Sequence, residues 1–189
     1  MNTLIVDNKD DISDIIVTED MYIKIILEDI GTLINIDVME NQNLLVFEVD
    51  KKTNNNINYN IRSGANVIVN KVCIDSNDIT TIKISGENTS IQYNNSFISY
   101  NDSEYIFNIE SLNEIGTCNL INRFVNVNNK KTNYKLNSNN LNIFKDNKEI
   151  DFNEIINLDN SIIKEFMLSN MTLSEEEIDD IRQMINNVQ

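Results

Sequence analysis

Between residues 34 and 136 the chain repeats one short pattern of hydrophobic and polar positions about every 24 residues. Each unit opens with residues that alternate between apolar and polar, as in a strand with one buried face. These alternating runs are Ile34–Val38, Ile57–Ile61, Ile82–Ile84, Tyr105–Ile109 and Tyr134–Leu136. The pattern predicts a mainly β fold built from similar units.

In the first three units, a polar corner that ends in asparagine separates this strand from a second one. The corner asparagines are Asn41, Asn66 and Asn88, and the second strands are predicted at 44–47, 67–72 and 90–93. Asparagine suits corners because it tolerates left-handed backbone conformations. One corner and two strands per repeat are therefore expected.

Three further segments have the composition of strands. Residues 12–17 fit a helical turn or an edge strand, of which the strand is preferred, and Met21–Leu27 is predicted as a strand that ends before Gly31. Residues 117–127 carry enough apolar positions for a longer strand that contains a bulge. The β-rich core is thus predicted to span residues 1–150.

Two β architectures fit this pattern. A right-handed parallel β-helix would stack each repeat as one coil. An antiparallel β-sandwich would instead turn at each polar break. The chain has only four glycines and no Asn-Gly or Asp-Gly pair, so the usual two-residue hairpin turns are scarce. This scarcity favours the parallel β-helix.

From residue 151 to 189 the apolar spacing becomes helical, which predicts a small C-terminal helical element. Helices are expected at about 160–169 and 173–187. In the second, Ile178 and Ile181 begin an apolar stripe, and Ser174 has the spacing of a capping box. The stripe must be buried, and the helices are expected to cap the open end of the β stack.

The composition of the chain limits the classes of binding partner that are expected. The net charge is −15 and the pI is near 4.2, which disfavours binding to nucleic acid or to anionic membranes. No basic segment precedes an apolar one at the N-terminus, and no stretch is apolar enough to span a membrane. A cytoplasmic location is the expectation. The abundance of isoleucine and asparagine suits short strands and corners, and equally an AT-rich genome.

The residues suggest no catalytic or metal centre. Histidine is absent, so the usual general base is missing. Cys73 and Cys118 are expected to be small buried residues rather than nucleophiles. Asp75 with Asp78, or Asp10 with Asp11, could bind a divalent ion only weakly, because neither has the spacing of a calcium loop. The adjacent pairs Lys51-Lys52 and Lys130-Lys131 are expected in solvated turns. The chain is predicted not to be an enzyme.

The segment from Phe166 to Glu177, which reads Phe-Met-Leu-Ser-Asn-Met-Thr-Leu-Ser-Glu-Glu-Glu, resembles the helical segment near the end of SufB/SufD proteins of iron–sulfur cluster assembly. There the pattern is Phe-Tyr-Leu-x-Ser-Arg-Gly-Leu/Ile-Ser-Glu-Glu-Glu. The family combines a right-handed parallel β-helix with a small helical domain. Met171-Thr172 replaces the family's Arg-Gly, and the histidine and cysteine implicated in cluster assembly have no counterpart here.

The resemblance implies a minimal or diverged SufD-like scaffold subunit that pairs with a SufB-like protein. Its C-terminal helices would dock on a SufC-like ABC-type ATPase. By this resemblance the partner-binding residues are Phe166, Leu168, Leu173, Ser174, Glu175 and Ile178. The chain itself would hold no cofactor, although a transient iron–sulfur cluster could form at a partner interface. The alternative is a viral or phage structural or accessory β-protein that oligomerises.

Overall fold

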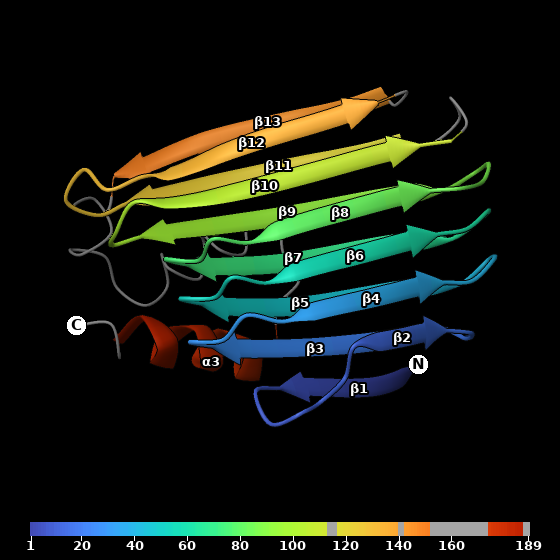
Figure 1. Ribbon diagram of the computed structural model, residues 1–189, viewed down its shortest axis with the longest axis horizontal. Coiled ribbons are helices and arrows are strands. Elements are labelled where there is room, and N and C mark those ends of the chain that lie inside the picture. The colour runs from blue at the N-terminus through green and yellow to red at the C-terminus, as the bar shows by residue number, and fades with distance from the viewer. Residues whose placement is uncertain (113–116, 140–141, 152–173, 187–189) are drawn as a thin grey trace.

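The computed structural model describes residues 1–112, 117–139, 142–151 and 174–186, and it is a parallel β-solenoid of about five turns followed by one short helix. Figure 1 shows two layers of strands, with the strands of one layer running opposite to those of the other. Every strand pairing in the described part of the chain is parallel. The β-helix prediction is confirmed, and the sandwich alternative is wrong.

Each coil contributes one strand to each of two sheets. The seven-stranded sheet contains, in spatial order, β1 (Asn2–Asp7), β3 (Met21–Glu28), β5 (Asn43–Lys51), β7 (Asn66–Ile74), β9 (Ser90–Ser99), β11 (Thr117–Asn126) and β13 (Asn142–Asp151). The six-stranded sheet contains β2 (Asp14–Val17), β4 (Leu33–Val38), β6 (Asn56–Ile61), β8 (Ile79–Ile84), β10 (Ser103–Ser111) and β12 (Thr132–Asn139). The helix is α3 (Glu175–Asn186).

The coils are regular at first and longer later. Asn66 lies beside Asn43 with an offset of 23 residues, and Asn58 lies beside Asn35 with the same offset. Between Asn95 and Asn122 the offset grows to 27 residues. The predicted period of about 24 residues averages over these coils. The strands of β9 and β11 pair without interruption, so the predicted bulge in residues 117–127 is not present.

One corner position recurs with left-handed backbone geometry, and the residues at this position are Asn41, Gly64 and Asn88. The repeat pattern predicted Asn66 as a member of this series, whereas Asn66 begins β7. The correction follows from backbone geometry and strand register. A Cβ on Gly64 would lie 2.2 Å from Oδ1 of Asn41, so a larger residue at this corner would require the Asn41 side chain to move.

The interior of the solenoid is filled by alternate residues of both sheets. Buried isoleucines, valines and aromatic residues form one continuous core that extends from Val6 to Leu120. Phe47, Val49 and Val72 face outward from the seven-stranded sheet, yet they are also buried. The part of the outward face that carries Phe47, Val49 and Val72 is therefore not a free surface, whereas Ile68 on the same face of β7 is 42% exposed.

Asparagine has a structural role in this fold beyond the corners. Equivalent asparagines in neighbouring coils stack, and the amide of one donates to the amide oxygen of the next. Such pairs lie outside the solenoid at Asn35 and Asn58, and inside it at Asn95 and Asn122. Each amide–amide hydrogen bond joins side chains of neighbouring coils. It therefore favours the register in which the equivalent asparagines lie side by side.

Helix α3 lies against β3 (Figure 1). The hydroxyl of Tyr22 donates to Oε1 of Glu177, and Nζ of Lys24 lies 3.6 Å from Oε1 of Glu176. Tyr22 and Lys24 alternate with core residues and therefore point out of the sheet. The helix packs on an outer face of the solenoid, so the expectation that it caps the open end of the stack is wrong for α3.

Candidate functional site

The start of α3 is the part of the predicted partner-binding surface that the structure describes. Ser174 and Glu175 are exposed there. The predicted capping box is confirmed, because the backbone N–H of Glu177 donates to Oγ of Ser174 at 3.2 Å and that of Ser174 donates to Oε2 of Glu177 at 2.7 Å. Ile178 lies in the helix, but its side chain is outside the described set. Phe166, Leu168 and Leu173, and the predicted helix at 160–169, lie outside the described residues.

A groove of about 560 Å³ lies beside this helix start. Its walls come from β1, β3 and α3, and include Met1, Ile5, Tyr22 and Glu176. Met1 and Ile5 are largely exposed apolar side chains. The helix terminus and its groove together form a surface suited to contact with another protein.

The last coil forms a second exposed region. The outer edges of β12 and β13 pair with no other strand in the described part of the chain. A cavity of about 220 Å³ opens there, lined by residues that include Phe124, Tyr134 and Glu149. Phe144 on β13 is 64% exposed. This end therefore combines unpaired backbone groups with exposed aromatic side chains. Both features are typical of a sheet edge to which a partner protein adds a strand.

The most unusual chemistry is inside the solenoid, where four charged side chains meet between β5, β7 and the corner before β8. Nζ of Lys71 lies 2.5 Å from Oε1 of Glu48, 2.6 Å from Oδ2 of Asp50 and 3.4 Å from Oδ2 of Asp78. All four side chains are buried. We call Glu48, Asp50, Lys71 and Asp78 the interior charge cluster. Three carboxylates surround one ammonium, so the cluster carries excess negative charge when all are ionised.

Burial changes the protonation of this cluster. Desolvation raises the pKa of Asp50 to about 7, although the attraction of Lys71 opposes the shift. Desolvation likewise raises the pKa of Asp78 to about 7 against the same attraction. For Lys71, desolvation favours the neutral amine, but the nearby carboxylates outweigh it and raise the pKa of its ammonium. Protons are therefore held on this cluster close to neutral pH.

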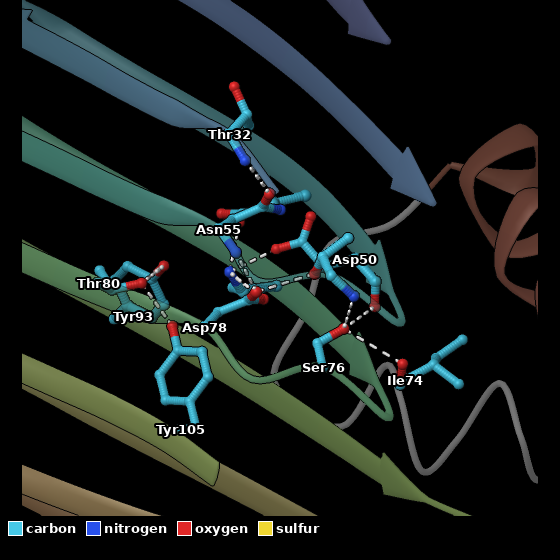
Figure 2. Close-up of polar contacts among 12 residues, drawn as sticks. Thr32, Asp50, Asn55, Ile74, Ser76, Asp78, Thr80, Tyr93 and Tyr105 are labelled. Atoms are coloured by element: carbon cyan, nitrogen blue, oxygen red, sulfur yellow. Dashed lines mark hydrogen bonds and ion pairs between the residues drawn. The ribbon is translucent and has the colours of Figure 1, made fainter. Parts of the chain in front are cut away.

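Figure 2 shows how the corner after β7 holds Asp78 in place. Oδ1 of Asp78 accepts a hydrogen bond from the hydroxyl of Thr53 at 2.9 Å and from the backbone N–H of Asn55 at 2.7 Å. The hydroxyl of Ser76 donates to the backbone carbonyl of Asp50 at 3.0 Å. These bonds fix one oxygen of Asp78 and leave the other facing Lys71.

The other three members, Glu48, Asp50 and Lys71, meet because of the register between β5 and β7. Glu48 on β5 is paired with Lys71 on β7, and Asp50 is paired with Cys73 two positions along. The same interior column continues with Asn95, Asn122 and Asn147, whose amides are hydrogen-bonded in series. The interior thus holds one continuous polar column within an apolar core.

The alternation of buried and exposed positions along β5 and β7 indicates that the charged residues of this cluster face the core. Lys71 alternates with Val67 and Val69, and Glu48 alternates with Leu44 and Val46, so each charged residue shares the core face of its strand. The sequence prediction assigned no role to Glu48, Asp50 or Lys71, and it considered Asp78 only as a weak ligand for a divalent ion. It also expected Lys51 in a solvated turn, whereas Lys51 ends β5, is buried and contacts Glu28 at 2.5 Å.

The remaining candidates have structural roles. Cys73 and Cys118 are free and buried, as predicted, and desolvation raises the pKa of both thiols, that of Cys118 to about 12. Asp75 accepts hydrogen bonds from the backbone of Tyr100 and Asn101, so it does not share a ligand set with Asp78. Among the described residues, no group of three His, Cys, Asp or Glu side chains has the arrangement of a metal site.

No protein-family model, curated protein or solved structure matches this chain. Within the described residues, none of the helices is long and apolar enough to cross a membrane.

Proposed function

We propose that this chain is a non-enzymatic assembly subunit that pairs through the β12–β13 end of its solenoid with a second β-solenoid protein. The observation that carries the proposal is the terminal coil, whose described edges are unpaired and whose Phe144 is exposed. Backbone groups on such an edge are satisfied when a strand of a partner extends the sheet.

The specific form of the proposal is a SufD-like subunit with a SufB-like partner and a SufC-like ATPase that docks on the C-terminal helical element. Its support is the order of a β-solenoid followed by a capped helix, together with the segment that resembles the SufB/SufD family. In this role the chain is structural, and any iron–sulfur cluster is transient and held at the partner interface. Burial of Cys73 and Cys118 is consistent with a subunit that does not supply cluster ligands.

Co-purification from the native cell tests this function. Tagged wild-type chain is expected to bring down both a second β-solenoid protein and an ABC-type ATPase. Phe144→Asp should release the β-solenoid partner, because it places a charge beside the proposed edge contact. Ile16→Asp, at a similarly exposed position on β2 near the other end, is the matched control and should retain it. Recovery of neither partner with the wild-type chain would refute the proposal.

A second candidate is a structural β-protein, of viral or phage type, that assembles from copies of itself. The observation that favours it is that both ends of the stack, at β1–β2 and at β12–β13, have unpaired edges within the described residues. Since all strands are parallel, the end of one chain can continue the stack of another, and such head-to-tail contacts produce filaments. Light scattering of the purified chain distinguishes the candidates: an assembly subunit stays monomeric, whereas self-assembly grows with concentration.

A further inference from the structure

We propose that Lys71 and Asp50 condense to an intramolecular amide bond, with Glu48 as the group that accepts and returns the protons. This modification would join two neighbouring coils of the solenoid covalently. It is independent of the partner that the protein assembles with.

The reacting groups are already in contact. Nζ of Lys71 lies 2.6 Å from Oδ2 of Asp50, and strand pairing between β5 and β7 holds the two side chains in adjacent coils. Both side chains are completely buried. Groups held in such contact behave as if at very high local concentration, which removes most of the entropic cost of bringing them together.

The proton acceptor is also in contact. Oε1 of Glu48 lies 2.5 Å from the same nitrogen. A lysine must lose a proton before its nitrogen can attack a carbonyl carbon, and Glu48 is placed to take it. Asp78 is farther from the nitrogen, at 3.4 Å, and its other oxygen is occupied by Thr53 and Asn55. The arrangement therefore distinguishes Glu48 from Asp78.

The surroundings favour the neutral acid of Asp50. The ring of Tyr105 lies 5.3 Å from the lysine nitrogen, and Tyr59 and Tyr93 are fully buried in the same region of the core. Oδ2 of Asp50 forms an ion pair with Nζ of Lys71 at 2.6 Å, and Glu48 and Asp78 are the carboxyl groups beside it. Burial raises the pKa of Asp50 to about 7, so its neutral acid, which is the electrophile, is populated. Condensation replaces an ion in this site with a neutral amide.

The reaction balances without an external reagent. Glu48 takes a proton from the ammonium of Lys71, and the free amine attacks Cγ of the neutral Asp50 acid. In the tetrahedral adduct, Glu48 gives its proton to the departing hydroxyl and accepts the second proton of the nitrogen. The new C–N bond forms, the C–O bond breaks and one water leaves. Glu48 ends protonated and the total charge is unchanged.

The bond would be a covalent cross-link between two coils. Repeat proteins are held by contacts between neighbouring coils, so they can separate coil by coil. The chain's cysteines form no disulfide, and Cys73 and Cys118 are both free. An amide between β5 and β7 closes a loop of one coil and prevents the two coils from separating when the rest of the chain unfolds.

Intact mass spectrometry of the purified full-length chain, measured after denaturation, tests the proposal. The expected mass is that of the sequence less one water molecule. Proteolysis should yield one branched peptide in which the side chains of Asp50 and Lys71 are joined. The chain offers an internal control, because Lys51 and Glu28 are also 2.5 Å apart in adjacent coils, but Glu28 is 42% exposed. The control peptides should remain separate.

Variants identify the roles. Glu48→Gln and Lys71→Arg should have their full sequence masses, and Lys51→Arg should still lose one water. If Asp50 is the acylated residue, Asp50→Asn releases ammonia in place of water, and a variant that still lost water would overturn the assignment. A wild-type chain with its full sequence mass, or a bond from Lys71 to Glu48 or Asp78, would also overturn it. The wild-type peptide map needs no variant to fold.

Discussion

Two lysine–glutamate pairs in neighbouring coils use the same geometry in different surroundings. Lys71 contacts Glu48 and Lys51 contacts Glu28, in each case at 2.5 Å and with a 23-residue offset. The first pair is sealed in the solenoid interior, whereas Glu28 is partly in water. The distance between two charges does not determine their energetic role, because solvent sets both the cost of ionisation and the strength of the attraction.

The two pairs differ in solvent exposure because their side chains lie on opposite faces of the strands. Glu48 and Lys71 alternate with core residues, while Glu28 and Lys51 lie on the opposite face of their strands. Shifting a residue by one position along a strand moves it from core to exterior. The same kind of ion pair is thus partly solvated on one face, where Glu28 reaches water, and completely buried on the other.

The largest expected effect comes from removing each lysine. Lys71→Met removes the nitrogen that contacts Glu48, Asp50 and Asp78 and leaves three buried carboxyl groups without that partner, so it should lower the free energy of unfolding by about 3–5 kcal/mol. Lys51→Met should cost about 1 kcal/mol or less, since its partner is solvated. Urea denaturation of the two variants measures both values. Equal losses would show that solvent exposure does not separate the pairs.

The next effect is the pH dependence of stability. The pKa of Asp78 is raised from 3.8 to about 7 by burial, and so is that of Asp50 where it is a free acid, so the folded state holds protons that the unfolded chain has released. Stability should therefore fall as the pH rises from about 4 to about 7, by a few kcal/mol. Asp78→Asn should flatten this slope, whether or not Asp50 is in an amide bond.

Thermal denaturation across this pH range provides the measurement, and Asp102→Asn is its control. Asp102 is a surface carboxylate that contacts Lys130 and accepts a bond from the backbone of Lys131, and these contacts lower its pKa. Its titration lies below the window, so Asp102→Asn should keep the slope of the wild type. A slope unaffected by Asp78→Asn would mean that this carboxyl does not hold a proton in the folded state.

The sequence was sufficient to predict the solenoid because the pattern depends on local properties. Alternation identified the repeated strands, and the scarcity of hairpin turns favoured parallel stacking. The capping box at Ser174 was likewise predicted, since it needs only residues within one helical turn. These features require no knowledge of which distant residues meet.

The interior charge cluster was missed because its members meet only through inter-coil register. Asp50 approaches Lys71 after β5 and β7 align, and Asp78 joins them through the corner that Thr53 and Asn55 hold. Asn66 was misassigned to the corner for the same reason. Residue type suggested an asparagine series, whereas backbone geometry and strand register place Gly64 at the corner.

A smaller effect on stability is expected from the stacked asparagines. They allow the same comparison between a buried and a partly exposed position, with neutral side chains. Asn122 bridges Asn95 and Asn147 inside the solenoid, so Asn122→Ala leaves buried amide groups unpaired and should cost about 1–3 kcal/mol. Asn58 makes a bond of equal length to Asn35 at a partly exposed position. Asn58→Ala should cost less, because water replaces the lost partner. Urea denaturation compares the two, and a larger loss at Asn58 would contradict the solvent argument.

The smallest effect is expected from salt. Exposed ion pairs such as Lys135 with Glu104 weaken when ionic strength rises, because mobile ions screen charges that face water. Mobile ions cannot reach the interior charge cluster, so its contribution to the free energy of unfolding should not change with salt concentration. The difference in unfolding free energy between wild type and Lys71→Met should therefore stay constant from low to high sodium chloride. The smaller difference between wild type and Lys135→Met should shrink toward zero over the same range. If the Lys71 difference also shrank, ions would have to reach the cluster, and the interior would not be the water-excluded site that raised pKa values and amide formation both require.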